Sequence, residues 1–203
     1  MEIRELNKNN IDNKIINHAV RILKRGGVVV YPTDSSYGLG CDPENIKAVK
    51  KIYKIKNRPA SEPFLMIASS AAMVAKYAKF SKAARAAAAR RWPGPLTMVL
   101  EARPEIKLAK QMVKHGKIAF RVPKDKFLIK LVKKFKKPII STSANMSGRA
   151  PIYDGKKLVK VFAGAKLKPD LIISVGALPS RQPSTIIEFK NGAKTLRPGP
   201  IKL

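Results

Sequence analysis

The chain contains few of the residues on which disulfide-rich, metal-binding and membrane proteins depend. Cys41 is the only cysteine, and His18 and His115 are the only histidines. A single cysteine excludes an internal disulfide and suits a reducing cytoplasm, and three widely separated soft ligands do not make the four-ligand set of a structural zinc site. No apolar run approaches the ~18 residues of a transmembrane helix, and the mixed, acidic N-terminus lacks the apolar core of a signal peptide. These absences predict a cytoplasmic protein with no membrane partner and no metal held by its own side chains.

Several catalytic and nucleotide-binding motifs are also absent. No P-loop pattern occurs, and Gly38-x-Gly40 continues to Pro43 where the dinucleotide fingerprint requires glycine. The sequence has no GxSxG nucleophile elbow and no pair of carboxylates spaced for acid–base work. The remaining candidate groups are hydroxyls, amides, lysines and arginines. They suit binding and charge neutralisation in a phosphate-centred reaction better than covalent catalysis.

Acidic residues are scarce as well, and the charge balance is extreme. The chain has 42 Lys and Arg against 13 Asp and Glu, which gives a net charge of +29. Such a field attracts RNA, nucleotides and other polyanions. The alternative is a solvated, lysine-rich surface, because the lysines are scattered over helices and loops and are not interleaved with aromatic residues. The charge therefore predicts affinity for RNA and not a role in reading it.

The length and the apolar patterning predict one α/β domain over residues 1–203. A hydrophobic content of 45% over 203 residues is enough for a proper core. Helices are expected at 11–25, at 42–57 with Asp42 as cap and Pro43 first, after Ser69 and Ser70, at 82–91 after Ser81, at 126–135 and at 158–162. Strands are expected at 28–31, 64–68, 96–100, 118–122, 138–140, 171–173, 185–189 and 195–196. Strands that alternate with helices, followed by several strands without helices between them, predict a mixed parallel and antiparallel sheet with flanking helices.

The stretch from Ser141 to Gly148 is the most informative part of the chain. It follows the apolar strand expected at 138–140, so three hydroxyls and an amide are expected to emerge together where that strand ends. Such groups donate and accept hydrogen bonds without charge and can line a pocket for an anionic or amino-acid-like ligand. The alternative is an ordinary turn, which favours Ser, Asn and Gly for conformational reasons.

Further polar and charged sets follow other expected elements. Lys56 and Arg58 end a helix, where basic residues are also favourable with the helix dipole alone. Arg121 lies within an apolar strand and needs an anionic partner or a cavity. Asp34 is one candidate partner, and a bound carboxylate or phosphate is the other. The remaining sets are residues 32–40 after the first strand, Ser184-Thr185 at the start of a late strand, and Arg197-Pro198-Gly199 after the last one.

Taken in order, these sets resemble the YrdC/Sua5 family of L-threonylcarbamoyladenylate synthases. The matching pieces are Gly27-Val-Val-Val-Tyr-Pro-Thr-Asp, Tyr37-Gly-Leu-Gly-Cys-Asp, Lys56-x-Arg58-Pro, Trp92-Pro-Gly-Pro-Leu-Thr, Arg121-Val-Pro, Ser141-Thr-Ser-Ala-Asn-x-Ser-Gly, Ser184-Thr and Leu196-Arg-Pro-Gly. They span about residues 11–200, nearly the whole chain. The resemblance implies a twisted α/β sheet around a basic cavity, and it implies that the additional C-terminal domain of longer Sua5 proteins is absent.

The resemblance also implies a nucleotidyltransferase reaction and a role for each matching residue. L-threonine, bicarbonate and ATP give threonylcarbamoyl-AMP and pyrophosphate, for the t6A modification of tRNA by a downstream transferase. The implied threonine residues are Ser35, Arg121, Ser141 and Ser184. The implied ATP residues are Lys56, Arg58, Lys117, Ser143, Asn145 and Arg197, of which Lys56 and Arg58 are catalytic. Mg²⁺ is expected to arrive with ATP, because the site offers few carboxylates to hold it.

The chain departs from the family pattern in two places. Ser35 and Ser36 precede Tyr37 where many relatives read Thr-Val, but Ser35 keeps the hydroxyl group, so this change carries little weight. Ile67 stands where many bacterial members have histidine. One expected threonine contact is then lost or replaced. The alternatives are a protein of the same fold that binds double-stranded RNA or tRNA in translation, and a divergent carbamoyl-type transferase. The stretch 148–155 is the candidate for a loop that closes the cavity.

Overall fold

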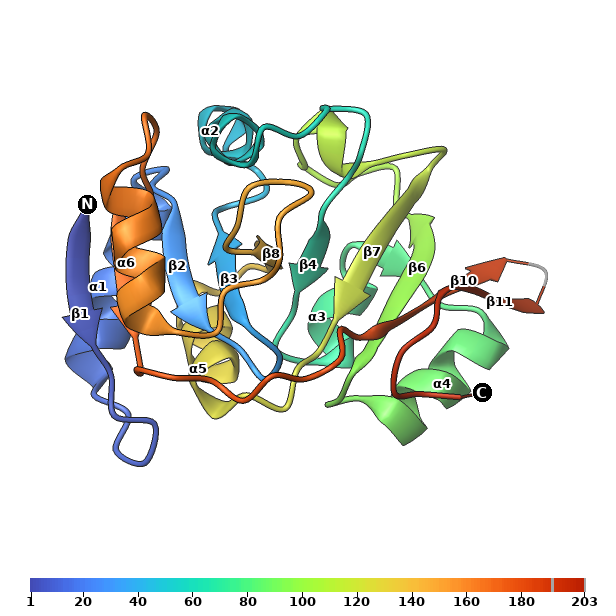
Figure 1. Ribbon diagram of the computed structural model, residues 1–203. Coiled ribbons are helices and arrows are strands. Elements are labelled where there is room, and N and C mark those ends of the chain that lie inside the picture. Colours follow the sequence, from blue (N-terminus) through green and yellow to red (C-terminus); the bar gives the residue numbers. More distant parts are fainter. Residues whose placement is uncertain (191, 203) are drawn as a thin grey trace.

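One strongly twisted sheet runs through the molecule, with helices packed along both of its sides (Figure 1). The computed structural model describes residues 1–190 and 192–202. The sheet has eleven strands, in the order β1-β9-β2-β3-β8-β4-β7-β6-β10-β11, with β5 paired to β6. The strands are β1 Glu2–Glu5, β2 Val29–Pro32, β3 Tyr37–Gly40, β4 Leu65–Ile67, β5 Ala78–Lys79, β6 Leu96–Ala102, β7 Lys117–Arg121, β8 Ile139–Ser143, β9 Leu171–Ser174, β10 Thr185–Lys190 and β11 Gly192–Arg197.

The sheet is mixed, as the order of elements predicts. Strand β4 pairs with β7 in parallel and with β8 antiparallel, and β6 pairs with β10 in parallel and with β7 antiparallel. The helices are α1 Asn13–Lys24, α2 Ile46–Lys56, α3 Ala71–Ala75, α4 Lys82–Arg91, α5 Lys126–Phe135 and α6 Gly155–Ala163, with one 3₁₀ turn at Lys110–Met112. The α/β fold class is therefore confirmed. Within the described residues, every helix is too short or too polar to cross a membrane.

Local capping explains where several helices begin. The side chains of Ser70, Ser81 and Asp125 accept backbone N–H groups at the starts of α3, α4 and α5, as the sequence predicts for the first two. The expected start of the second helix is wrong. Asp42 accepts the N–H of Glu44 in a turn, and Asn45 caps α2 instead, by accepting the N–H of Ala48. Two good capping residues lie three positions apart, and the sequence alone does not distinguish between them.

Strands β1 and β3 were not expected from the sequence. Strand β1 is short and exposed, and it forms only because β9 lies beside it in parallel register. Strand β3 contains two glycines and reads as a loop, yet it is fully buried between β2 and β8. Its Gly40 is required by close packing, because a Cβ there would lie 2.2 Å from the carbonyl oxygen of Ile140.

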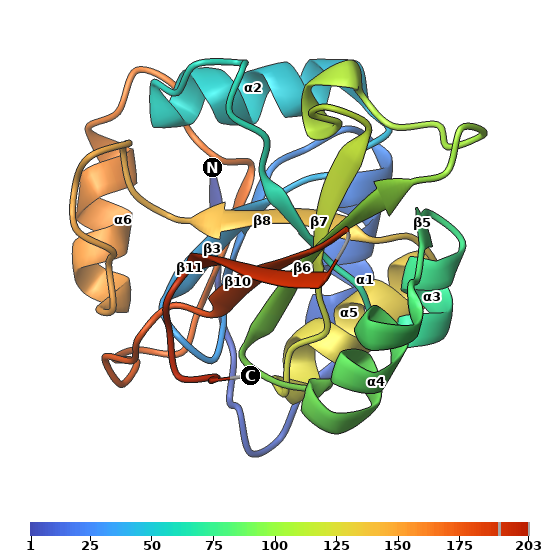
Figure 2. The same ribbon diagram turned by 90° about the vertical axis from the view of Figure 1, so that its right-hand side faces the viewer.

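Buried apolar side chains form two clusters that hold the helices on the sheet. The smaller one places α1 and α5 against β2, β8 and β9. The larger one includes residues from α2, α4 and α6 and from the central strands. In Figure 2, α3 and α4 lie together near one edge of the molecule, with α6 on the opposite side. The segment that joins β9 to β10 runs along the sheet from its β9 end to its β6 end (Figure 1). This path brings residues of the late chain next to the central strands.

Candidate functional site

Alternate side chains of the central strands line a cavity of about 520 Å³. Successive residues of a strand point to opposite faces, so each strand presents every second side chain to this space. The residues concerned are Ser141 and Ser143 of β8, Leu65 and Ile67 of β4, Ala119 and Arg121 of β7, Val99 of β6 and Ile186 of β10. Loops complete the lining and contribute Arg58 and Arg181, and a further arginine, Arg197, comes from the end of β11. Asp34 is the only acid among the described residues that line the cavity, so the cavity is basic.

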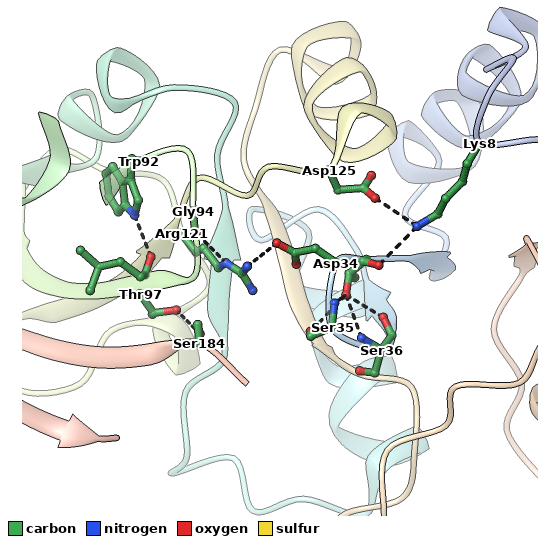
Figure 3. A network of polar contacts seen from close by, with 12 residues as sticks. Lys8, Asp34, Ser35, Ser36, Trp92, Gly94, Thr97, Arg121, Asp125 and Ser184 are labelled. Carbon is green, nitrogen blue, oxygen red and sulfur yellow. Dashed lines mark hydrogen bonds and ion pairs between the residues drawn. The ribbon is translucent and has the colours of Figure 1, made fainter. Parts of the chain in front are cut away.

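Arg121 is the most deeply buried charge in the cavity wall. It ends β7 and is only 7% exposed. Its Nε donates to the carbonyl oxygen of Gly94 at 3.0 Å, and its Nη2 lies 2.5 Å from Oδ2 of Asp34 (Figure 3). Burial lowers the pKa of Arg121, and the Asp34 carboxylate opposes that shift. The expectation that this arginine needs an anionic partner or a cavity is met by both.

A hydroxyl-centred turn positions Asp34 and Ser35 at the cavity wall. The Oγ1 of Thr33 accepts the N–H groups of Ser35 at 3.0 Å and Ser36 at 3.2 Å, and it donates to the carbonyl oxygen of Ser36 at 2.6 Å. Such a turn closes locally and leaves the intervening side chain free to point outward. Figure 3 shows Asp34 directed from this turn toward Arg121. Ser35, predicted as a threonine residue, therefore lies beside the Asp34–Arg121 pair.

Ser184 and Arg197 form a second polar group at the far wall. The Oγ of Ser184 lies 2.7 Å from Oγ1 of Thr97, and Arg197 Nη2 donates to the carbonyl oxygen of Ser184 at 2.7 Å. Burial lowers the pKa of Arg197, and the positive charge of Arg121 adds to that effect. The two arginines are thus close enough to influence one another across the cavity.

Strand β8 is longer than the sequence indicates, and this changes the placement of its hydroxyl groups. The expected strand ends at residue 140, whereas β8 continues to Ser143. The register pairs Ser141 with Leu65 of β4 and Ser143 with Gly38 of β3. The strands on both sides, β4 and β3, pair with the backbone of residues 141–143 and extend β8. The residue types in this stretch favour a turn, so the sequence does not indicate this pairing. Ser141 and Ser143 consequently face the cavity from a strand, and the loop begins only after them.

Lys56 and Asn145 lie behind this wall rather than along it. Lys56 is 2% exposed, and its Nζ donates to the carbonyl oxygens of Ser143 at 2.7 Å and Asn145 at 2.8 Å and to Oδ1 of Asn145 at 3.2 Å. Burial, assisted by the charge of Arg58, lowers the pKa of Lys56 to about 8. Lys56 thereby holds the turn after β8 in place. Its predicted contact with ATP, and that of Asn145, stay predictions.

Lys117 also lies apart from the cavity lining. It stands on the cavity side of β7, four residues before Arg121, but it forms an ion pair with Glu188 of β10. This pair lowers the pKa of Glu188. The role of Lys117 toward ATP therefore stays a prediction, because its position neither supports nor contradicts such a contact.

The structure adds cavity residues that sequence reasoning missed. Thr33, Tyr153 and Arg181 line the cavity, although none was predicted as a site residue. Arg181 comes from the segment between β9 and β10, and nothing in its sequence indicates that the segment passes the cavity. Pro151 and Tyr153 belong to the stretch 148–155, whose closing role stays a prediction. Ile67 also lines the cavity, in register with Arg121 on the adjacent strand.

Comparisons with known proteins bear on the family and the fold of this chain. The Sua5/YciO/YrdC family model, described as telomere recombination, matches residues 21–199. The crystal structure of P. abyssi Sua5 complexed with L-threonine is similar over 98% of this chain and 58% of that chain, with 30% identity and a TM-score of 0.89. This chain therefore spans little more than half of that Sua5.

Two further structures match over nearly their whole length. E. coli YciO is 27% identical over 98% of this chain and 97% of its own, with a TM-score of 0.88. The solution structure of MTH1692 from Methanobacterium thermoautotrophicum is 28% identical over 100% of this chain and 96% of its own, with a TM-score of 0.73. The extent of the family match, together with the cavity built from the motifs that suggested it, leads to one conclusion: the chain belongs to the Sua5/YciO/YrdC family.

Proposed function

We propose that this protein is an L-threonylcarbamoyladenylate synthase, which joins L-threonine, bicarbonate and ATP. The observation that carries the proposal is the buried Arg121, which faces a cavity rimmed by serine hydroxyls. A relative 30% identical to this chain has been crystallised with L-threonine. A buried arginine with free N–H groups facing a cavity is suited to the planar carboxylate of an amino acid, which it can bind through two parallel hydrogen bonds.

The proposed chemistry has two steps. In the first step, bicarbonate takes up a proton and loses water to give carbon dioxide, and the ammonium group of threonine releases a proton to become a neutral amine. The amine nitrogen attacks the carbon dioxide, which gives a carbamate and releases a second proton. A carbamate oxygen then attacks the α-phosphorus of ATP, and the bond to pyrophosphate breaks. The second step brings several anions together. Positive charge held in place around them lowers the barrier, because it needs no rearrangement as the charge develops.

Arg58 and Arg197 are the residues best placed to supply that charge. Both line the cavity, as does Arg181. We assign the triphosphate to these three arginines, the threonine to Arg121 with Ser35, Ser141 and Ser184, and the nucleotide to Ser143. Lys56 and Asn145 support the nucleotide side through the turn that they hold.

Magnesium, in this proposal, enters with ATP. The described residues contain no group of three or more His, Cys, Asp and Glu side chains that could hold a metal ion. Asp34, the one carboxylate that the described part of the chain places along the cavity, is already paired with Arg121. The oxygen ligands of magnesium are therefore expected to come chiefly from the phosphates and from water.

The test is an assay for pyrophosphate release by the purified protein. We expect release that requires L-threonine and bicarbonate together, and transfer of label from ¹⁴C-bicarbonate into an adenylate product. Release that is indifferent to threonine would refute the proposal. Exposed Glu105→Gln serves as a control variant and should retain wild-type rates, because Glu105 lies outside the cavity lining.

Binding to RNA is a second candidate function, favoured by one observation, the net charge of +29. It is compatible with synthesis for tRNA modification and with a handover to a transferase. Salt-sensitive RNA binding without any threonine-dependent turnover would favour this function over the enzymatic one.

A further inference from the structure

Among the described residues, Asp34 is the one acidic side chain along a cavity that otherwise carries positive charge. It does not simply neutralise a neighbour at the surface, because its partner Arg121 is buried and the pair faces the ligand space. The two groups place a negative and a positive charge 2.5 Å apart in the cavity wall.

Arg121 keeps binding capacity while it is paired with Asp34. A guanidinium has five N–H groups. One of them donates to Gly94 and one to Asp34, and the others have no protein acceptor among the described residues. A ligand carboxylate can therefore bind Arg121 without displacing Asp34.

Asp34 also has an oxygen atom that can accept a further hydrogen bond. Its Oδ1 is buried without any hydrogen-bond partner in the described part of the chain. An unpaired carboxylate oxygen in a dry environment is unfavourable. Asp34 lines the cavity and its side chain keeps 18% of its surface exposed, so a donor in the cavity can approach this carboxylate. A donor with positive charge is the ligand group that would satisfy it.

We propose that Asp34 and Arg121 together recognise the zwitterionic head of a free α-amino acid, with Arg121 on the carboxylate and Asp34 on the ammonium group. Both charges of such a ligand sit on one carbon atom, which matches the adjacent opposite charges of the pair. This inference rests on the proposed function and adds a residue and a selection rule to it. Carboxylic acids without an amino group and N-blocked amino acids are excluded before any chemistry takes place.

The rule follows from charge. A ligand with a carboxylate alone meets Arg121 but is repelled by Asp34, and it leaves Oδ1 unpaired. A zwitterion satisfies both partners. Asp34 consequently contributes to specificity and does not only hold Arg121 in place.

The experiment measures binding by titration calorimetry to L-threonine and to (R)-3-hydroxybutyrate, which lacks only the amino group. Wild type, Asp34→Asn and the control Glu105→Gln are compared. Asn keeps the shape of Asp without its charge, and Glu105 is an exposed acid outside the cavity lining.

We expect wild type to prefer threonine by about 100-fold or more, because only threonine gains the charge-assisted contact with Asp34, whereas 3-hydroxybutyrate is repelled by that carboxylate and leaves Oδ1 unpaired. Asp34→Asn should weaken threonine binding by about tenfold or more and leave 3-hydroxybutyrate binding equal or tighter. The control should behave as wild type.

Three results would overturn the inference. Equal weakening of both ligands by Asp34→Asn would mean that Asp34 only positions Arg121. Unchanged threonine binding in Asp34→Asn would remove the ammonium contact while leaving the proposed function intact. Equal affinity of wild type for the two ligands would also rule out the ammonium contact. This comparison needs no variant, so the inference can be tested even if Asp34→Asn fails to fold. If wild type binds neither ligand, the proposed function falls as well.

Discussion

Replacing Lys56 by methionine tests whether this buried lysine holds the wall of the cavity. Methionine has a similar length and fills similar space, but it cannot donate a hydrogen bond. The substitution removes the donor from three oxygen atoms, two on backbone carbonyls and one on the Asn145 amide. These oxygens belong to the turn that follows Ser143, so the expected damage is confined to one wall of the cavity.

The magnitude follows from two opposing effects. The two Asn145 oxygens are left without a donor at a cost of about 2 kcal/mol each, and the Ser143 carbonyl, which keeps the N–H of Asn145, loses about 1 kcal/mol, so the cost is about 5 kcal/mol together. Removing a buried ammonium group relieves about 3 kcal/mol, because the pKa of Lys56 is lowered from 10.5 to about 8. We therefore expect Lys56→Met to lose about 2 kcal/mol at pH 7, which shifts Tm by about 4–8 °C in a chain of this size.

Thermal and urea denaturation at pH 7 measure this loss. The matched control is Lys54→Met, on the same helix but exposed, which should change stability by less than about 0.5 kcal/mol. A Lys56→Met variant as stable as the control would refute the reasoning.

The same contact predicts a pH dependence. Because the pKa of Lys56 is about 8 in the folded protein and 10.5 in the unfolded chain, the unfolded chain binds more protons between these values. Wild type therefore gains stability from Lys56 as the pH rises through that window, and Lys56→Met lacks this gain. The stability difference between the two should widen by up to about 3 kcal/mol between pH 8 and 10.5. A difference that stays constant with pH would contradict the assigned burial of a charged amine.

Further predictions concern the cavity and its support. Arg58→Ala should lower threonine-dependent pyrophosphate release by about 100-fold or more with an unchanged circular dichroism spectrum, and near-normal turnover at low ATP would argue against its place on the phosphates. Arg121→Lys should raise the KM for threonine more than that for ATP, because lysine lacks the planar guanidinium that can bind a carboxylate through two parallel hydrogen bonds while it contacts Gly94 and Asp34. Equal increases would speak against the carboxylate role. Tyr37→Phe should lower the free energy of unfolding by about 1–3 kcal/mol, since its hydroxyl donates to a carbonyl oxygen at 2.7 Å and accepts an N–H at 2.9 Å; chemical denaturation checks this, and a neutral result would mean that water replaces the hydroxyl.

Much of the secondary structure follows from local signals. Helix α5 occupies the expected range 126–135, because both of its signals are local: the apolar spacing within the helix and the Asp125 cap directly before it. The starts of α3 and α4 follow from serine caps in the same way. Strand β3 does not, because its glycines acquire strand structure only between β2 and β8.

The candidate site can be divided in the same way, into features that follow from local sequence and features that depend on the tertiary structure. The sequence by itself determined the residue types: scarce acids, an arginine in an apolar strand, and clustered hydroxyls in an order typical of one family. These are properties of single residues and short segments, and they indicated an anion-binding site.

Only the tertiary structure decided which of these residues meet and which face the cavity. It paired Arg121 with Asp34, turned Lys56 toward the turn after Ser143, and brought Arg181 to the cavity from a segment without a local signal. The physical reason is that each of these contacts joins positions far apart in the chain. Strand register, burial and the path of the β9–β10 segment set them, and all three depend on the assembled sheet.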